Sequence, residues 1–262
     1  MSETSYNPTE LLICTASRLM EDGSTAFIGT GIPMLAAALA QRRQAPNLVP
    51  VFEFGGTGAI LEDLPLAVGE ARTFHKAVAA SGITDVMEAA QRGFIDYGFL
   101  GGAQVDPYGN LNSTIIGPQH HPPKVRLPGS GGAPEMAVHC REIFIVMPQS
   151  RRGFVERLDF LTTLGHGEGG TGRRDLGLTS KGPTRIITDL CVMEPDTVTR
   201  ELTVTSLHPG ITAGQVRGAT GWPVRFAGQV AETPPPTSDD LRVLRDLLRR
   251  TAEAHGTRLP EG

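Results

Sequence analysis

The sequence predicts an α/β protein in which helices flank an open, mostly parallel sheet. Helix signals alternate with short apolar runs along the N-terminal part of the chain, and these runs end in glycine-rich loops. The run EIFIVM, residues 142–147, is apolar after its first residue, as strands covered on both faces of a parallel sheet are. The sequence has no internal repeat and no sharp change of composition. One domain over residues 1–262 is therefore expected, with a C-terminal helical extension at about residues 237–254.

The first helix is expected to begin at Asn7. Asn7 can cap the helix, Pro8 suits its first position, and Glu10 completes a capping-box pattern. Apolar residues then recur at helical spacing. A short strand over residues 25–28 should follow, and its loop leads to a second helix that Pro33 opens.

The next expected strand covers residues 49–54, VPVFEF, and it places a carboxylate where none is usual. Gly55 and Gly56 follow it, so the pattern predicts a buried strand that ends in a flexible loop. Glu53 lies between the two phenylalanines. A charge buried in such a strand costs free energy unless it is paired or needed. The local sequence also allows Glu53 to lie at an edge and point to water.

Later segments continue the alternation of helix and strand. Helices are expected over residues 85–92 and 212–218 and in the C-terminal segment that Thr237 caps. Further strands are expected at residues 95–100, 142–147, 184–190 and 201–207, of which the last alternates like an edge strand. Residues 165–182 form a glycine-rich stretch, and a loop of this length is often functional.

Composition and charge exclude several classes of protein. Apolar residues make up 39% and charged residues 20% of the chain, as in ordinary soluble globular proteins. The formal net charge of −4 gives no basic surface for nucleic acid. No apolar run is long enough to span a bilayer and the N-terminus has no basic segment, so a cytoplasmic protein is expected. The three cysteines form no CxxC pair, which fits a reducing compartment and no structural zinc.

Three short motifs are weak candidates for a site. The loop Gly29-Thr30-Gly31 follows a strand and precedes a helix, where backbone N–H groups can meet an anion, but a plain tight turn is the alternative. His120 and His121 are adjacent and have no further ligand at metal spacing, so no metal site is expected. Ser130 in PGSGGA does not match the GxSxG pattern of serine hydrolases.

Two denser stretches are stronger candidates. In GGAQVDPYGNLNST, which starts at Gly101, residues 106–110 have the chemistry of a turn, which leaves the polar residues on both sides of it unexplained. RLPGSGGA, residues 126–133, has three glycines in four positions before a helix-like segment. Successive glycines let a backbone approach a ligand closely, and their N–H groups can form an oxyanion hole.

Four stretches together resemble the smaller, β-type subunit of family I CoA-transferases, in particular the glutaconate CoA-transferase branch. They are FIGTGIPMLAAALA, VFEFGG, FLGGAQVDPYGNLNST and RLPGSGGA, in the family's order and at about its spacing. The resemblance covers most of the chain. It implies the CoA-transferase (NagB/RpiA-like) fold, an active site between two related subunits, and a distinct α-type partner subunit in a heterooligomer. It implies no bound cofactor and no metal, because the coenzyme A thioester is a substrate.

The resemblance also implies roles for single residues. The family's strand-end glutamate matches Glu53, which would attack the acyl-CoA thioester as a nucleophile. The family's glycine-rich oxyanion loop matches GSGGA, so Gly131 and Gly132 would supply amide N–H groups. Contacts to the substrate or to coenzyme A are expected from Gly29, Thr30, Gly31, Gln104, Gly129 and Ser130.

The function implied is transfer of coenzyme A between an acyl-CoA and a small, dicarboxylic acid through a glutamyl-CoA thioester on Glu53. The alternative is a CoA-ester hydrolase or decarboxylase on the same scaffold, like relatives that cleave a steroid ring or decarboxylate a glutaconyl-type ester. Those relatives lack the glutamate, so its presence here favours transfer. A binding subunit whose partner holds the catalytic groups is a third possibility. Phe52 and Phe54 depart from the family's pattern, which leaves room for altered specificity.

Overall fold

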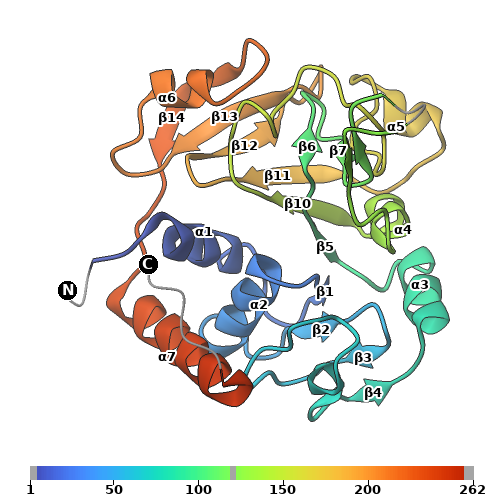
Figure 1. Cartoon of the computed structure of the whole chain (residues 1–262), viewed down its shortest axis with the longest axis vertical. Coiled ribbons are helices and arrows are strands. Elements are labelled where there is room, and N and C mark those ends of the chain that lie inside the picture. Colours follow the sequence, from blue (N-terminus) through green and yellow to red (C-terminus); the bar gives the residue numbers. More distant parts are fainter. Residues whose placement is uncertain (1–4, 119–121, 257–262) are drawn as a thin grey trace. The chain divides into compact units, whose positions relative to one another are not determined.

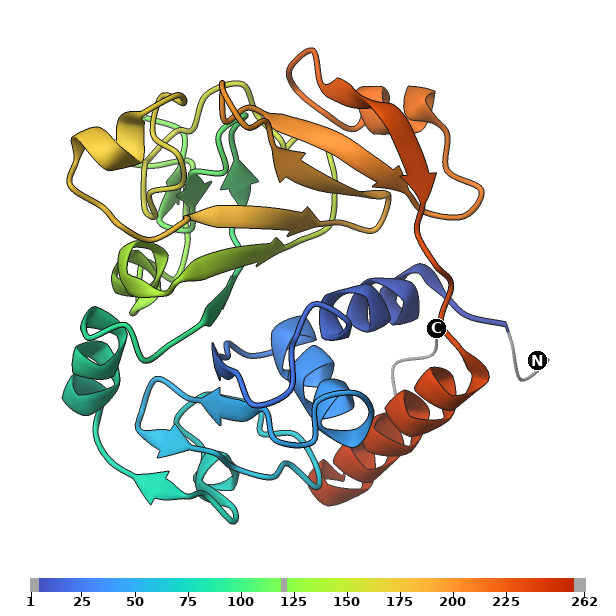
Figure 2. The same cartoon turned by 180° about the vertical axis from the view of Figure 1, so that it is seen from behind.

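The structure is a computed structural model, which describes residues 5–118 and 122–256. It divides into two compact units (Figures 1 and 2). Unit 1 holds the residues up to Phe99 and those from Pro235 on, and unit 2 runs from Leu100 to Pro234. The single domain expected over residues 1–262 stays a prediction.

A sheet in the order β5-β1-β2-β3-β4 forms the centre of unit 1. β1 runs parallel to both of its neighbours, β2 and β5, while β3 and β4 add antiparallel strands. The carboxyl ends of the three parallel strands therefore meet at one edge of the sheet. The bounds are β1 Thr25–Phe27, β2 Val49–Val51, β3 Gly56–Thr57, β4 Ala79–Ala80 and β5 Tyr97–Leu100.

Three helices pack against one another in unit 1 and lie together in Figure 1. They are α1 (Pro8–Ser17), α2 (Ile32–Arg42) and α7 (Ser238–His255). Two further helical segments connect strands of the sheet, the 3₁₀ helix η1 (Ala71–Phe74) and α3 (Ile83–Gln91).

The predicted starts of the first and last helices are confirmed. Asn7 caps α1 in a reciprocal capping box with Glu10, and Pro8 is its first residue. Thr237 caps α7 in the same way with Asp240. Leu241, Leu244 and Leu247 of α7 are buried, so this helix contributes to the core of unit 1.

Unit 2 contains a second run of strands in the order β14-β13-β12-β11-β10. The pairs β10–β11 and β13–β14 are parallel, and the other neighbours are antiparallel. The bounds are β10 Glu142–Val146, β11 Pro183–Ile187, β12 Cys191–Pro195, β13 Leu202–Leu207 and β14 Arg225–Glu232. The expected class, an open sheet with parallel strands and flanking helices, is confirmed.

One strand prediction is wrong in unit 2. Residues 201–207 were expected at an edge, but β13 lies between β12 and β14. β14 is mostly exposed and mixes polar with small residues, so its sequence lacks the apolar pattern that predicts a strand.

Shorter elements of unit 2 surround its sheet. β6 pairs with β7 and β8 pairs with β9 as two antiparallel hairpins. Their bounds are β6 Gln104–Val105, β7 Leu111–Asn112, β8 Ile115–Ile116 and β9 Val125–Arg126. The helices are α4 (Ala133–His139), α5 (Gly172–Asp175) and α6 (Ala213–Gly218). None of the helices within the described ranges has both the length and the apolar character that a membrane span requires.

Candidate active site

Glu53 lies in a tight turn that follows β2. The N–H of Gly55 donates to the C=O of Phe52 at 2.9 Å, and the N–H of Phe52 donates to the C=O of Gly56 at 2.8 Å. These bonds close a hairpin between β2 and β3. The strand expected over residues 49–54 therefore ends at Val51, and the remainder of that prediction is wrong.

The turn lowers the free-energy cost of the charge on Glu53, compared with a position inside a buried strand. Phe52 is fully buried, Glu53 is half-buried, and the side chain of Phe54 is 52% exposed. The carboxylate thus keeps contact with water on one side and with the protein on the other. A partly hydrated carboxylate at the end of a strand costs far less than one inside a sheet.

Two glycines hold this turn by letting other backbone segments approach. A Cβ atom on Gly56 would lie 2.1 Å from the carbonyl oxygen of Thr73, and one on Gly55 would lie 2.0 Å from that of Ser81. Gly55 also has a φ of +111°, which side chains rarely adopt. The N–H of Ser81 donates to the C=O of Gly55 at 3.2 Å. The segment from η1 to β4 therefore braces the turn that carries Glu53.

The loop Gly29-Thr30-Gly31 lies at the neighbouring strand end. β1 and β2 are parallel with Phe27 opposite Val51, so the loop and the turn of Glu53 leave the sheet at the same edge. Thr30 and Gly31 are exposed. Gly31 has a φ of +78° and begins α2 as its N-cap. The structure thus brings the predicted anion loop and the predicted nucleophile to adjacent strand ends of unit 1.

The predicted oxyanion loop belongs to unit 2. Gly129 and Gly131 both have positive φ, at +106° and +49°, so the chain turns twice through a region that favours glycine. Gly132 is the N-cap of α4, and the C=O of Ser130 accepts from the N–H of Ala133 at 3.1 Å. Gly131 is exposed at this bend, whereas Gly132 is buried. Backbone N–H groups at such a bend suit an oxyanion.

Polar residues after β7 anchor this loop, which the sequence did not reveal. The hydroxyl of Ser113 donates to the C=O of Gly129 at 2.8 Å, and the N–H of Gly129 donates to the C=O of Ser113 at 2.9 Å. The hydroxyl of Thr162 accepts from the N–H of Ser113 at 2.9 Å and bonds the hydroxyl of Thr114 at 2.7 Å. The unexplained polar run NST therefore positions the glycine loop.

Gln104 occupies a buried hydrogen-bond network. Its amide oxygen accepts from the side chain of Asn112 at 2.8 Å and from the N–H of Asp159 at 3.1 Å. Its amide nitrogen donates to the carboxylate of Asp159 at 3.0 Å. The network holds β6, β7 and the segment around residue 159 together. Substrate contact by Gln104 stays a prediction.

The turn over residues 106–110 is the hairpin turn that its sequence predicts. The Asp106 carboxylate accepts from the N–H groups of Tyr108 and Asn110 at 2.9 and 3.0 Å. The side-chain oxygen of Asn110 then accepts from the N–H groups of Gly165 and Gly167, at 2.7 and 3.1 Å. Burial raises the pKa of Asp106, although its hydrogen bonds oppose the shift. These groups are structural because they satisfy one another.

No metal centre forms in the described part of the chain. Across residues 5–118 and 122–256, no three His, Cys, Asp or Glu side chains are grouped so that they can hold a metal ion. His120 and His121 lie outside the described residues, so the expectation of no metal stays a prediction.

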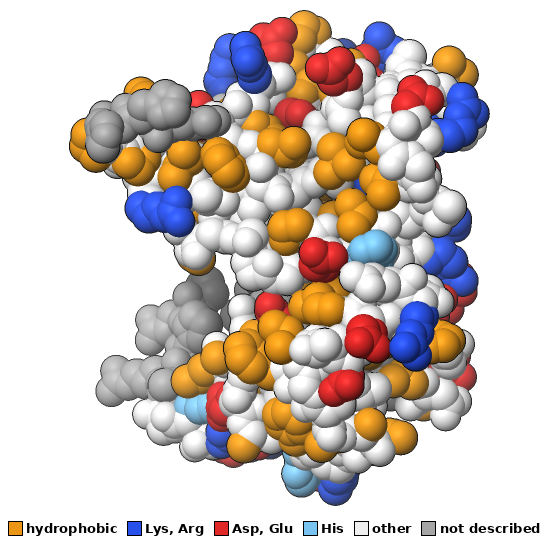
Figure 3. All heavy atoms as spheres, turned by 90° about the vertical axis from the view of Figure 1, so that its right-hand side faces the viewer, with side chains coloured by type: hydrophobic (Ala, Val, Ile, Leu, Met, Phe, Trp, Pro, Cys, Tyr) orange, Lys and Arg blue, Asp and Glu red, His pale blue; other side chains and the backbone are white. Residues whose placement is uncertain are grey.

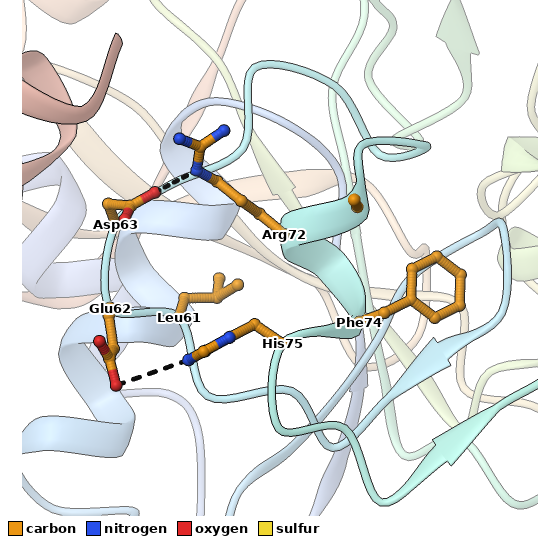
Figure 4. A pocket seen from close by; sticks show the side chains of 7 residues that line it. Leu61, Glu62, Asp63, Arg72, Phe74 and His75 are labelled. Atoms are coloured by element: carbon orange, nitrogen blue, oxygen red, sulfur yellow. Dashed lines mark hydrogen bonds and ion pairs between the residues drawn. The ribbon is translucent and has the colours of Figure 1, made fainter.

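A surface cavity of about 440 Å³ in unit 1 is lined by charges that pair with one another (Figure 4). His75 Nε2 lies 3.5 Å from a carboxylate oxygen of Glu62, and Arg72 bonds Asp63. Paired charges of this kind stabilise the surface of the loop and leave little for a ligand to neutralise. The cavity is a poorer candidate for a site than the ends of the strands.

Each unit by itself offers a group of the kind that acyl transfer uses. Unit 1 has a half-buried carboxylate beside an exposed glycine loop, and unit 2 has a glycine bend at which Gly131 is exposed. A carboxylate can attack an acyl carbon, and backbone N–H groups can stabilise the oxyanion that forms.

Comparisons with known proteins identify a family. The profile of the coenzyme A transferase family matches residues 9–219. The chain is 47% identical over 254 residues to the B-type subunit of 3-oxoadipate CoA-transferase from Pseudomonas knackmussii, covering 97% of each chain. It is 32% identical to the B-type subunit of glutaconate CoA-transferase from Acidaminococcus fermentans, covering 89% of this chain and 90% of that one.

A solved structure and a more distant relative complete the comparison. The crystal structure of glutaconate coenzyme A-transferase from Acidaminococcus fermentans superposes with a TM-score of 0.86 at 29% identity, covering 92% of this chain and 94% of that one. The cholesterol ring-cleaving hydrolase IpdB subunit of Rhodococcus jostii is 26% identical, over 83% of this chain and 81% of that one. The hydrolase is thus the more distant of the two kinds of relative.

Proposed function

The chain belongs to the coenzyme A transferase family, and from this premise we propose that it transfers coenzyme A to or from a dicarboxylic acid related to 3-oxoadipate. It is a B-type subunit of a CoA-transferase. The observation that carries the proposed chemistry is the half-buried Glu53 carboxylate in the turn after β2. The choice of acid rests on the 47% identity to the B-type chain of the 3-oxoadipate enzyme.

The first half-reaction loads coenzyme A onto Glu53. A carboxylate oxygen of Glu53 bonds to the acyl carbon of the thioester, and the C=O electron pair moves onto oxygen. The oxyanion collapses, the C–S bond breaks, and the CoA thiolate leaves an acyl-glutamyl anhydride. The thiolate then attacks the glutamyl carbonyl carbon, which releases the first acid as its carboxylate and leaves a glutamyl-CoA thioester.

The second half-reaction reverses these steps with another acid. The carboxylate of the accepting acid attacks the glutamyl thioester and expels CoA thiolate, again through an anhydride. The thiolate attacks the new acyl carbon and frees the Glu53 carboxylate. One thioester is exchanged for another, so no water or net proton is consumed.

The glycine bend supports this route. We assign the oxyanion hole to the N–H groups of Gly131 and Gly132, and substrate or coenzyme A contacts to the loop Gly29-Thr30-Gly31, to Gly129 and Ser130, and to Gln104. One oxyanion-hole donor typically contributes about a hundredfold or more to the rate.

A partner subunit of the α type completes the proposed enzyme. Among the described residues of unit 1, six large apolar side chains are exposed. Hydrophobic side chains gather in patches among charged ones on the face in Figure 3. Apolar patches of this kind favour coverage by another protein. Coverage also excludes water, which would otherwise hydrolyse an anhydride or thioester at the exposed side of Glu53.

Mass spectrometry of the assembled complex tests the proposal. The complex is incubated with coenzyme A thioesters of dicarboxylic acids, 3-oxoadipyl-CoA included, and this chain is then weighed under denaturing conditions. We expect an adduct of the mass of coenzyme A on the peptide that contains Glu53. Consumption of acyl-CoA without an adduct would instead indicate hydrolysis or decarboxylation.

A glutamine variant completes the test. Glu53→Gln should abolish both the adduct and transfer, because an amide cannot form the anhydride. Glu21→Gln, an exposed glutamate of the same unit, serves as the matched control and should transfer at the wild-type rate. Transfer by the assembled Glu53→Gln complex would refute the proposed role.

A further inference from the structure

A surface cavity of unit 2 is lined by cationic side chains. It has a volume of about 330 Å³ and lies between the loop over residues 166–181 and the hairpin that joins β12 to β13. The N–H of Gly170 donates to the C=O of Thr199 at 2.9 Å and joins the two walls. Its cations are Arg173, Arg174, Lys181 and Arg200, and no acidic residue is among the described residues that line it.

The guanidinium of Arg173 is buried without a carboxylate. Its side chain donates to the carbonyl oxygens of Gly165 and Ala137, at 2.8 and 3.0 Å, and to the hydroxyl of Ser180 at 2.6 Å. Longer bonds reach the carbonyl oxygens of Ser180 and Leu164, at 3.3 and 3.5 Å. Arg173 is only 7% exposed, and no ion pair joins it to a carboxylate in residues 5–118 or 122–256. Burial lowers its pKa to about 10. A buried charge held only by neutral groups is stabilised when an anion comes near it.

Two more arginines of the cavity are also without an acidic partner. Arg174 is exposed and Arg200 half-buried, and in the described ranges neither has a carboxylate within ion-pair distance. Lys181 differs, because its ammonium lies 3.0 Å from a carboxylate oxygen of Glu142. The unneutralised charge of the cavity therefore comes from three guanidinium groups. The side-chain N–H groups of Arg173 are already engaged within unit 2, so Arg173 contributes charge, whereas Arg174 and Arg200 are the groups that can bind phosphate oxygens in pairs.

Arg200 also adopts a backbone conformation that would favour glycine. Its φ is +64°, at the end of the turn where its N–H donates to the C=O of Asp196 at 3.1 Å. A side chain at positive φ is less stable than glycine in the same place. The turn itself therefore does not explain an arginine at this position, whereas a role for its side chain in the cavity does.

We propose that this cavity binds the phosphate groups at the nucleotide end of coenzyme A, an inference that rests on the proposed transferase function. That end carries a 3′-phosphate and a diphosphate, so its several charges match three guanidinium groups. The cavity is also larger than one phosphate ion needs. Nucleotide binding here would fix the coenzyme while its thioester end reacts elsewhere.

Calorimetry on the assembled complex tests the cavity directly. The probe is adenosine 3′,5′-bisphosphate, which carries the 3′-phosphate and one phosphate of the diphosphate. We expect Arg174→Gln and Arg200→Gly each to weaken its binding about tenfold. Arg152→Gln removes an exposed arginine of the same unit without an acidic partner in the described residues, and it should bind like wild type.

The variant Arg200→Gly separates a loss of binding from a loss of stability. Glycine suits the positive φ of this position, so the melting temperature should not fall. Wild-type affinity in both arginine variants, or inorganic phosphate that binds as tightly as the bisphosphate, would overturn the proposal.

Kinetics separate this inference from the proposed function. With an acyl-CoA substrate, each arginine variant should raise KM about tenfold and leave kcat within about twofold. With the same acyl group on pantetheine, which lacks the nucleotide, variants and wild type should be equal. Bisphosphate binding that depends on the arginines in a complex without transfer activity would support the cavity and refute only the transferase. Transfer with unchanged KM in both variants would refute only the cavity.

Discussion

Ser113 positions the glycine bend through two hydrogen bonds with Gly129. One uses its hydroxyl and the other its carbonyl, so only the first can be removed by mutation. The bend must hold its N–H groups steady to stabilise a developing oxyanion, since small displacements weaken such bonds steeply. At the scale of single residues, Ser113 is therefore a positioning residue.

Ser113→Ala should lower kcat of the assembled enzyme about tenfold and change KM little. Loss of one hydrogen bond removes about 1 kcal/mol of stability, which lowers the melting temperature by about 2–4 °C. Ser113→Thr keeps a hydroxyl and should restore most of the rate. Equal kcat in Ser113→Ala and wild type would show that the bend is held without this bond.

The three cysteines are inert in the folded chain. Cys14, Cys140 and Cys191 are all buried and free of disulfides. Burial raises the pKa of Cys14 and of Cys191 to about 12, so neither forms the reactive thiolate at neutral pH. All three are small side chains of the core.

Iodoacetamide should therefore leave the native protein unmodified at pH 7.5, as intact mass measures. The same treatment in denaturant should add three carbamidomethyl groups, one for each cysteine. Rapid labelling of the native enzyme with loss of transfer would contradict the burial of these thiols.

At the scale of elements, the turn over residues 52–55 depends on its two glycines. Gly56→Ala would force a Cβ atom to within 2.1 Å of the Thr73 carbonyl oxygen. We expect a loss of about 3 kcal/mol, because backbone rather than a flexible side chain must move. The melting temperature should fall by about 6–12 °C. Gly228→Ala, where a Cβ atom meets nothing within 4 Å, is the matched control. Equal melting temperatures would show that η1 does not brace the turn.

Helix α7 is attached to unit 1 through Asp240. Its carboxylate lies 3.1 Å from Arg18 Nη2 and 3.0 Å from Arg43 Nε, and it accepts from the N–H of Thr237. Burial raises the pKa of Asp240, but the bonds from Thr237, Arg18 and Arg43 outweigh burial and lower it overall. A lowered folded pKa stabilises the fold above about pH 4, the unfolded value. This stabilisation is lost as pH falls through the folded pKa.

Asp240→Asn should lower the melting temperature by about 2–6 °C at pH 7. The difference from wild type should shrink as pH falls below about 4, because the wild-type carboxylate takes up its proton as pH passes through the lowered folded pKa. Asp239→Asn, whose side chain is 57% exposed, should differ from wild type by less than about 2 °C. If the difference in melting temperature between Asp240→Asn and wild type does not change with pH, the carboxylate charge is not its cause.

Helices and strands could be predicted where the residues that determine them are close together in the sequence. Asn7 and Thr237 predict helix starts because a capping residue and its partner lie within one turn of each other in the sequence. The turn over residues 52–55 was missed because a segment from residue 73 to residue 81 imposes it. Likewise, Thr162 supports Ser113 across 49 residues, and no local pattern records such a contact. The local sequence singled out Glu53 as an unusual charge and the GSGGA loop as a possible anion site, but the roles proposed for them rest on the family motifs.

At the scale of the whole molecule, the proposed machinery is divided between the two units. Glu53 and the loop Gly29-Thr30-Gly31 belong to unit 1, while the GSGGA bend and the arginine cavity belong to unit 2. Each unit keeps its own part in place by bonds within itself. A mutation of Glu53 therefore tests a group held by unit 1, and a mutation in the GSGGA bend or the arginine cavity tests groups held by unit 2.

Unit 1 is discontinuous in the chain, and this affects its synthesis. Arg18 and its partner Asp240 are 222 residues apart. A ribosome adds about 5–20 residues per second, so α7 is synthesised roughly 10–45 s after α1. During that time unit 2 can be completed, while the faces of α1 and α2 that α7 later covers stay open to chaperones. Nascent chains stalled before residue 237 should be cut by protease in α1 and α2 but not in unit 2. Equal protection of both units would show that unit 1 folds without its last helix.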